Sequence, residues 1–327
     1  MKIVFMGTGE FAVPSLEAVH HAGHHISLVV SQPDRPKGRG LILKETPVKF
    51  VALKLGLPVF QPDRLRLAPD RVIAEKPEVL VVVAYGQILR ENILECAPRG
   101  ALNVHASLLP KYRGAAPIQW ALANGETRTG VTTMQLDRGM DTGPMLLQRD
   151  CAIEPDDTTA TLERRLAAIG ARLLLETLDG LEKGSISARA QDETAATKAP
   201  LIRKADGVVA FERSALEIAH RLRGFSPWPG LQFTHEGRSV KILAARALTS
   251  PRTGVGVQPG TILSVGREGV DVACGRGSVL RLERVQPESR GPVSAFDFAN
   301  GAKVKTGTLF LDSAHTDTAS RPTTPKD

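Results

Sequence analysis

The chain has 327 residues, of which 42% are hydrophobic and 24% are charged, a composition typical of a folded protein with about two domains. No apolar run reaches the ~18–20 residues of a membrane-spanning helix, and the N-terminus lacks the long apolar core of a signal peptide, so we expect a cytoplasmic protein that does not bind membranes. The three cysteines are isolated, at spacings that no metal site uses, and we expect them to be reduced, with no metal bound.

The net charge of +7 is concentrated in the second part of the chain. Residues 201–310 contain 16 Lys and Arg against 9 Asp and Glu, whereas residues 1–200 contain 24 against 23. A basic domain beside a nearly neutral one is typical of a protein that binds a polyanion such as nucleic acid. A general contribution to solubility explains such a moderate excess nearly as well.

The first half of the chain alternates strand patterns with helix patterns. Apolar and β-branched runs predict strands at residues 2–6, 26–31, 57–60, 77–86 and 101–105. Amphipathic stretches predict helices at residues 11–23, 46–56 and 158–184. Two further segments, 130–136 and 143–153, are predicted to form a β-ribbon. The alternation predicts an α/β domain with a doubly wound, Rossmann-like parallel sheet.

The composition changes near residue 184. Residues 184–206 are polar with little periodicity, and we interpret them as a linker between an α/β domain at 1–183 and a second domain at 207–311. The second domain starts with one helical pattern and continues with short apolar runs separated by glycines, a spacing that favours a small antiparallel barrel. Residues 312–327 are rich in Thr, Ser, Asp and Pro and are predicted to be a disordered tail.

Two glycines follow the first predicted strand directly. Gly7 and Gly9 precede a helix in a G-x-G-x-x-A pattern that dinucleotide-binding folds also use. Asp34 lies near the distance at which such folds place a carboxylate for the ribose. The pattern therefore leaves a nicotinamide-dependent oxidoreductase open, against a tight strand-to-helix turn that binds no nucleotide.

Polar side chains interrupt the strand predicted at residues 101–105. Because side chains alternate along a strand, Asn103 and His105 share one face, at the carboxyl end where open α/β sheets bind ligands. Asp141 follows in a loop bent by glycines. An Asn that donates to an oxyanion, a His that moves protons and an Asp are the parts of an acyl-transfer site, although two polar residues at a strand end can also be merely structural. No GxSxG motif supplies a nucleophile, so we expect the acceptor to attack directly.

A longer set of motifs resembles the folate-dependent formyltransferases. The segments NVHASLLPKYRGAAPIQWAL and GVTTMQLDRGMDTGPM carry the Asn, His and Asp of that family. The similarity to its methionyl-tRNA formyltransferases is longer, covers roughly residues 2–310, and includes FMGTGEFA, SQPDRPKGRG, VVVAYGQIL, QDE and RGFSPWPG. The resemblance implies a Rossmann-like formyltransferase domain followed by a small OB-like β-barrel domain that binds tRNA.

The resemblance also implies roles for individual residues. It makes Asn103, His105 and Asp141 the catalytic set for formyl transfer from 10-formyltetrahydrofolate to initiator methionyl-tRNA, in support of translation initiation. It assigns folate binding to the SLLP loop, which comprises Ser107, Leu108, Leu109 and Pro110. It assigns contact with the tRNA acceptor stem to the basic loop at 34–49, and within it to Arg35, Lys37 and Arg39. The implied reaction needs no metal, and we expect a monomer.

Other activities stay open at this point. A glycinamide ribonucleotide formyltransferase needs no basic second domain, whereas a formyltetrahydrofolate hydrolase or a formyltransferase acting on sugar nucleotides shares much of this layout. A pure RNA-binding module has no use for the three catalytic side chains. The chain departs from the family pattern at Gly9 and Arg90, where the family usually has proline.

Overall fold

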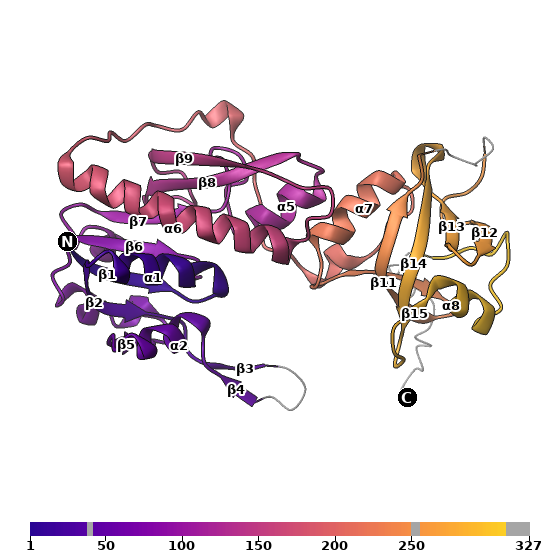
Figure 1. The fold of residues 1–327 in the computed structure, drawn as a ribbon, viewed down its shortest axis with the longest axis horizontal. Coiled ribbons are helices and arrows are strands. Elements are labelled where there is room, and N and C mark those ends of the chain that lie inside the picture. Colours follow the sequence, from indigo (N-terminus) through magenta and orange to yellow (C-terminus); the bar gives the residue numbers. More distant parts are fainter. Residues whose placement is uncertain (38–41, 250–255, 312–327) are drawn as a thin grey trace, which may run out of the picture. The chain divides into compact units, whose positions relative to one another are not determined.

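The computed structural model describes residues 1–37, 42–249 and 256–311, and the chain divides into two compact units (Figure 1). The first unit comprises residues 1–118, 127–154 and 161–201, and the second comprises residues 119–126, 155–160 and the described residues from 202 onward. Most of the segment that we interpret as a linker, up to residue 201, therefore belongs to the first unit. The tail predicted at 312–327 lies outside the described residues. Among the residues described, no helix combines the length and the apolar character needed to cross a membrane.

The first unit is built on a seven-stranded sheet with the order β5-β2-β1-β6-β7-β8-β9. Its strands are β1 (Lys2–Gly7), β2 (His25–Val30), β5 (Val59–Phe60), β6 (Val79–Val83), β7 (Ala101–His105), β8 (Arg128–Gln135) and β9 (Met145–Ala152). The pairs β5–β2, β2–β1, β1–β6 and β6–β7 are parallel. Strand β8 runs antiparallel to both β7 and β9. These pairings confirm the predicted Rossmann-like parallel sheet and the predicted ribbon.

Helices cover both faces of the sheet at β7. The helices of this half of the chain are α1 (Val13–His21), α2 (Pro47–Lys54), α3 (Asp70–Ile73), α4 (Glu91–Leu94), α5 (Pro117–Ala123) and α6 (Thr159–Lys183), with 3-10 turns η1 (Glu10–Ala12) and η2 (Leu65–Leu67). Helix α6 packs so closely on one face that a Cβ atom at Gly170 would lie 2.9 Å from Val104 Cγ1. On the other face, Ala101 is buried in a cluster with residues of η2, α3 and α4. Asn103 and His105 share the face of Ala101.

The direction of winding reverses between β1 and β6. From β1 the chain builds β2 and β5 on one side and then returns to the other side of β1 for β6 and β7. Doubly wound sheets bind their ligands at the carboxyl ends of the strands beside such a reversal. All five residues of β6 are buried, as expected for a strand that is covered on both faces.

A two-stranded ribbon, β3 (Arg35–Lys37) and β4 (Ile42–Lys44), lies between β2 and α2 in the chain (Figure 1). Asp34 anchors its base, because Lys49 Nζ donates to one carboxylate oxygen and Gln61 Nε2 donates to the other at 2.8 Å. Burial alone would raise the pKa of Asp34, but the hydrogen bonds from Lys49 and Gln61 lower it below its usual value. Both carboxylate oxygens therefore have partners in the protein, which argues against the ribose-binding role considered for Asp34.

The second unit contains an antiparallel sheet with the order β10-β11-β14-β13-β12, and β15 also pairs with β14. Its elements are β10 (Leu231–His235), β11 (Arg238–Ala247), β12 (Ile262–Gly266), β13 (Gly269–Ala273), β14 (Val279–Pro287), β15 (Val293–Ser294), α7 (Ala215–Gly224) and α8 (Ala295–Gly301). Thr234 on the edge strand β10 bridges to Leu311, and Thr261 beside the opposite edge strand bridges to Leu309. The short stretch at 309–311 therefore touches both edges of the sheet. Of the small antiparallel barrel predicted from the sequence, the antiparallel sheet is confirmed.

The two glycines after β1 have different surroundings and give a test of the fold. A Cβ atom at Gly7 would lie 2.9 Å from both Ala12 Cβ and Phe5 Cε1, whereas a Cβ atom at Gly9 would meet nothing within 4 Å. Gly9 also has a φ of −85°, which any residue adopts. We expect Gly7→Ala to destabilise the protein by about 1–3 kcal/mol through overpacking. We expect Gly9→Ala to stabilise it by about 0.4–1 kcal/mol through the unfolded state. Urea unfolding of both variants measures this contrast, and equal shifts would contradict it.

Candidate active site

Asn103 and His105 lie at the carboxyl end of β7, and neighbouring strands hold the backbone of both residues. Asn103 is in register with Val82 of parallel β6, and His105 is in register with Thr132 of antiparallel β8. The Asn103 side chain is half-buried, and the His105 side chain is 6% exposed. The alternation of the strand thus brings an amide and an imidazole to one face, as predicted from the sequence.

A backbone carbonyl orients the His105 ring. His105 Nε2 donates to the carbonyl oxygen of Tyr112 at 2.9 Å. Because a carbonyl oxygen only accepts, Nε2 carries the hydrogen in this arrangement and Nδ1 is left facing Asp141. Nδ1 lies 3.7 Å from Asp141 Oδ2, which is longer than a hydrogen bond but within the range of electrostatic interaction with the carboxylate. The hydrogen bond to Tyr112 therefore holds the ring with its Nδ1 edge facing the carboxylate of Asp141.

The carboxylate of Asp141 joins three segments of the first unit. Asp141 belongs to the loop between β8 and β9, and its Oδ2 accepts a hydrogen bond from the backbone N–H of Gly114 at 2.9 Å. Its Oδ1 lies 3.4 Å from Asn103 Nδ2. An amide nitrogen carries two hydrogens, so Nδ2 can contact Asp141 with one of them and donate the other to an oxygen of a substrate. The predicted set of Asn, His and Asp thus meets at one place.

The loop after β7 contains the residues that the resemblance assigns to folate. Thr132 Oγ1 fixes this loop, because it donates to the carbonyl oxygen of Ser107 at 2.7 Å and accepts from the N–H of Leu109 at 3.1 Å. Ser107 is completely buried and Leu109 is 3% exposed, so these two side chains shape the loop from inside. Leu108 and Pro110 are half-buried.

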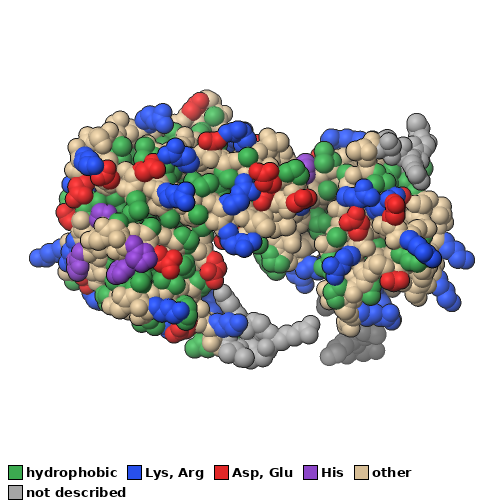
Figure 2. Space-filling model, in the orientation of Figure 1, with side chains coloured by type: hydrophobic (Ala, Val, Ile, Leu, Met, Phe, Trp, Pro, Cys, Tyr) green, Lys and Arg blue, Asp and Glu red, His purple; other side chains and the backbone are tan. Residues whose placement is uncertain are grey.

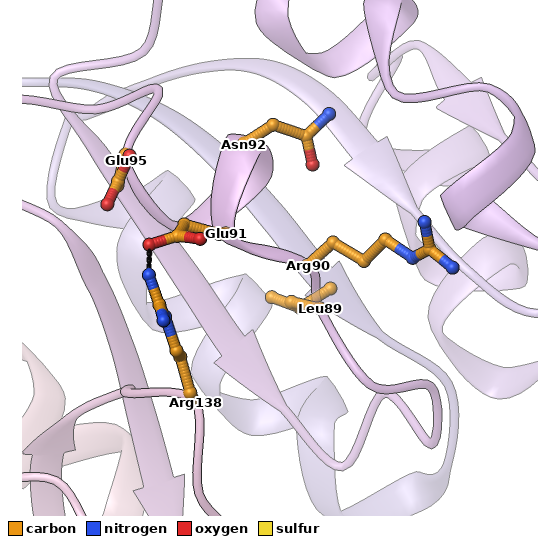
Figure 3. Close-up of a pocket in the computed structure, with 6 residues that line it drawn as sticks. All are labelled: Leu89, Arg90, Glu91, Asn92, Glu95 and Arg138. Atoms are coloured by element: carbon orange, nitrogen blue, oxygen red, sulfur yellow. Dashed lines mark ion pairs between the residues drawn. The ribbon is translucent and has the colours of Figure 1, made fainter.

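A hollow of about 590 Å³ lies beside the segment that follows β6 (Figure 3). It is lined by Leu89, Arg90, Glu91, Asn92, Glu95 and Arg138. Glu91 forms an ion pair with Arg138, and the Arg90 side chain extends away from that pair (Figure 3). Because β6 and β7 are parallel neighbours, the segment after β6 emerges at the sheet edge where Asn103 lies. The hollow has the size of a small-molecule site, and the sequence assigned none of its six residues to folate.

Two of the three basic residues assigned to tRNA, Arg35 and Lys37, lie on strand β3 of the β3–β4 ribbon. Arg39 lies outside the described residues. Arg35 is exposed, and its Nη2 donates to Gln32 Oε1 at 3.3 Å. Lys37 is the last residue of β3. The structure thus places Arg35 and Lys37 on one strand, next to the segment that contains Arg39.

The contacts that the sequence could not reveal are made by the backbone. The carbonyl oxygen of Tyr112 and the N–H of Gly114 bond His105 and Asp141, and every residue type except proline offers the same two groups. In the part of the chain that the structure describes, no three His, Cys, Asp or Glu side chains gather in a way that could hold a metal ion.

Comparison with known proteins shows which family the chain is similar to. Two family models match the chain, "Formyl transferase" over residues 1–178 and "Formyl transferase, C-terminal domain" over residues 201–303. A methionyl-tRNA formyltransferase of Solibacter usitatus is 48% identical over 93% of this chain and 96% of its own length. Another, of Anaeromyxobacter dehalogenans, is 50% identical over 93% of this chain and 98% of its own length.

Solved structures share the fold at much lower sequence identity. An N-formyltransferase from Helicobacter canadensis, in complex with folinic acid and dTDP-3-aminofucose, superposes with a TM-score of 0.67. It is 17% identical, and the match covers 88% of this chain and 99% of that one. This superposition shows that the two chains share a fold. With both family models matched in order and relatives near 50% identity along almost its whole length, the chain belongs to the formyltransferase family, among the methionyl-tRNA formyltransferases.

Proposed function

We propose that the chain transfers the formyl group of 10-formyltetrahydrofolate to the α-amino group of initiator methionyl-tRNA. The observation that carries this proposal is the meeting of Asn103, His105 and Asp141 at the end of β7. It occurs in a chain that is similar over 93% of its length to enzymes named for this reaction. The folate is a cosubstrate that supplies the formyl group, and no metal takes part.

The chemistry follows from what each side chain can donate. The neutral amine attacks the formyl carbon, a new C–N bond forms, and negative charge develops on the formyl oxygen. Asn103 Nδ2 donates to that oxygen, and His105 can donate to it or pass a proton. The bond from the formyl carbon to the folate nitrogen breaks, that nitrogen takes up a proton, and the amine loses one. Asp141 faces the imidazole and can relay protons through a water.

The folate is proposed to bind in the hollow beside Asn92 and against the SLLP loop. Leu89 offers an apolar surface for a flat ring, and Asn92 offers both a donor and an acceptor. Because Ser107 and Leu109 are buried, the contacts of the SLLP loop come from its backbone and from Leu108 and Pro110.

The second unit is proposed to be an OB-like barrel that binds the tRNA. Two observations support a barrel: the order of its antiparallel sheet, and the stretch at 309–311 that touches both edge strands. The charge of residues 201–310 supports RNA binding, and Lys and Arg side chains recur over the face of this unit in Figure 2. In this proposal residues 1–183 carry the chemistry and residues 207–311 add affinity for the phosphate backbone.

One assay separates this function from its alternatives. Labelled formyltetrahydrofolate is offered with methionyl-tRNA, glycinamide ribonucleotide, an amino-sugar nucleotide, or water alone. We expect label to appear on methionyl-tRNA. Label on another acceptor, or release of formate at the same rate without an acceptor, would assign the chain to a different activity.

The catalytic role of Asn103 predicts a large and specific loss of turnover. Asn103→Ala should lower kcat by ~10²–10³, the typical cost of removing one oxyanion donor. Folate binding should change much less, because the contact strengthens in the transition state. Asn103→Asp keeps the shape but loses the donor and adds charge beside Asp141, so it should be at least as impaired. Single-turnover kinetics and equilibrium folate binding check both variants, and near-normal turnover in Asn103→Ala would contradict the assignment.

The ribbon predicts discrimination between tRNAs. A planar guanidinium at the end of the acceptor stem can sense base pairing, whereas phosphate contacts by lysine cannot. Arg39→Leu should therefore impair formylation of initiator methionyl-tRNA more than that of a methionyl-tRNA with a fully paired acceptor end. Lys44→Leu, on β4, is the matched control because it removes one charge from the same ribbon. Lys44→Leu should impair formylation of both tRNAs equally. If Arg39→Leu also impairs both tRNAs equally, Arg39 contributes only its charge.

The basic second unit predicts a strong salt dependence of tRNA binding. Each duplex phosphate neutralised should contribute about −0.9 to the slope of log affinity against log salt. Filter binding between ~50 and 200 mM salt measures this slope. Folate binding is the internal control, since it does not use the second unit in this proposal. A slope near zero would remove the electrostatic role of residues 201–310.

A further inference from the structure

The segment after α6 places Gln191 behind the loop that carries Asp141. Arg189 exchanges two backbone hydrogen bonds with Met145, each 2.8 Å long, and so anchors the segment two residues before Gln191. Gln191 Nε2 donates to the carbonyl oxygen of Asp141 at 2.8 Å and to that of Gly143 at 2.7 Å. Both hydrogens of this amide nitrogen are therefore used on the backbone of one loop.

Arg113 fixes the orientation of the Gln191 amide. Arg113 Nε donates to Gln191 Oε1 at 2.9 Å, and its two terminal nitrogens each donate to Glu193 at 2.8 Å. Because arginine only donates, Gln191 must turn its oxygen to Arg113 and its NH₂ group to the two carbonyls. The next residue, Gly114, donates its N–H to the Asp141 carboxylate. Three hydrogen bonds and the peptide bond between Arg113 and Gly114 thus form a closed ring through Arg113, Gln191, Asp141 and Gly114.

The backbone at Asp141 needs such support. Its φ is +55°, in the left-handed region that residues with a side chain occupy at a cost. The side chain is thereby directed to Gly114 and His105, while the carbonyl oxygen is taken up by Gln191. The outer part of the loop has its own support, because Asp137 accepts from the N–H of Gly139 at 3.0 Å. Loss of the Gln191 contacts should therefore release the backbone at Asp141 without unfolding the whole loop.

We propose that Gln191 is a positioning residue of the active site. It holds the backbone of Asp141 so that the carboxylate faces His105 and Asn103, and Arg113 holds Gln191 in turn. The inference rests on the proposed formyl transfer, and Gln191 acts through Asp141 without touching the substrate. A displacement of catalytic groups by about 1 Å can cost roughly 10²-fold in rate, so the effect is measurable.

The test is a double-mutant cycle between Gln191 and Asp141. Gln191→Leu removes the amide at similar size, and Asp141→Asn removes the charge that the amide positions. In the wild-type background, Gln191→Leu should lower kcat by roughly 10–100-fold, with smaller changes in KM for either substrate. In the Asp141→Asn background, the same change should cost little more, because the group through which Gln191 acts is already lost.

Gln148→Leu is the matched control. The Gln148 amide also donates twice, to the carbonyl oxygen of Leu109 at 2.8 Å and to Thr132 Oγ1 at 3.0 Å, away from the Asp141 loop. Its effect on kcat should be the same factor in both backgrounds. Urea unfolding checks each variant, and Gln191→Glu, which keeps the shape and the acceptor for Arg113, replaces the leucine variant if that one does not fold.

The outcomes distinguish a failure of the inference about Gln191 from a failure of the proposed formyl transfer. If Gln191→Leu lowers kcat by the same factor with and without the Asp141 charge, Gln191 does not act through Asp141 and the inference is overturned. An unchanged kcat in Gln191→Leu overturns it as well. A wild-type protein that transfers no formyl group to methionyl-tRNA overturns the proposed function instead, and does so before any variant is compared.

Discussion

The geometry of the site depends on the carboxylate of Asp141, because three separate segments of the chain meet at it. The end of β7 supplies Asn103 and His105, the loop after it supplies the N–H of Gly114, and the β8–β9 loop supplies the carboxylate itself. Contacts outside this meeting point also hold these segments in place. The parallel pairing of β6 and β7 fixes the first, and the closed ring through Gln191 fixes the last. The rigid sheet thus positions two groups, and hydrogen bonds position the third.

The parts of this arrangement that follow from periodicity were predictable. The strand at 101–105, its parallel neighbour at 77–86 and the side of the sheet that Asn103 and His105 share all follow from patterns of apolar residues over a few positions. The antiparallel sheet of the second unit follows in the same way from short runs separated by glycines. Such patterns are local, so one sequence is enough to detect them.

The parts that depend on contacts between distant segments were not predictable from periodicity. Residues 184–206 have little pattern, which predicts a linker, yet Arg189 pairs with Met145 and Gln191 bonds the loop of Asp141. The QDE motif, which includes Gln191, is part of the resemblance to the family, but the resemblance gives no physical role for Gln191. The partners of His105 and Asp141 at residues 112 and 114 are backbone atoms, which have no signature in a sequence. The hollow beside β6 also went unassigned, because it arises from how the segment 89–95 leaves the sheet edge.

The two departures from the family pattern have a common physical basis. Gly9 has a φ of −85° and Arg90 has a φ of −86°, both extended and only slightly beyond the range of about −65 ± 15° that a proline ring imposes. The backbone therefore keeps the path that proline would give, and the loss of the ring acts mainly on the unfolded chain. At Gly9 a side chain would have met nothing, so the change leaves the turn as it is. At Arg90 the replacement adds a cation to the lining of the hollow, so this departure changes the charge of the proposed folate site and leaves the backbone that shapes it unaltered.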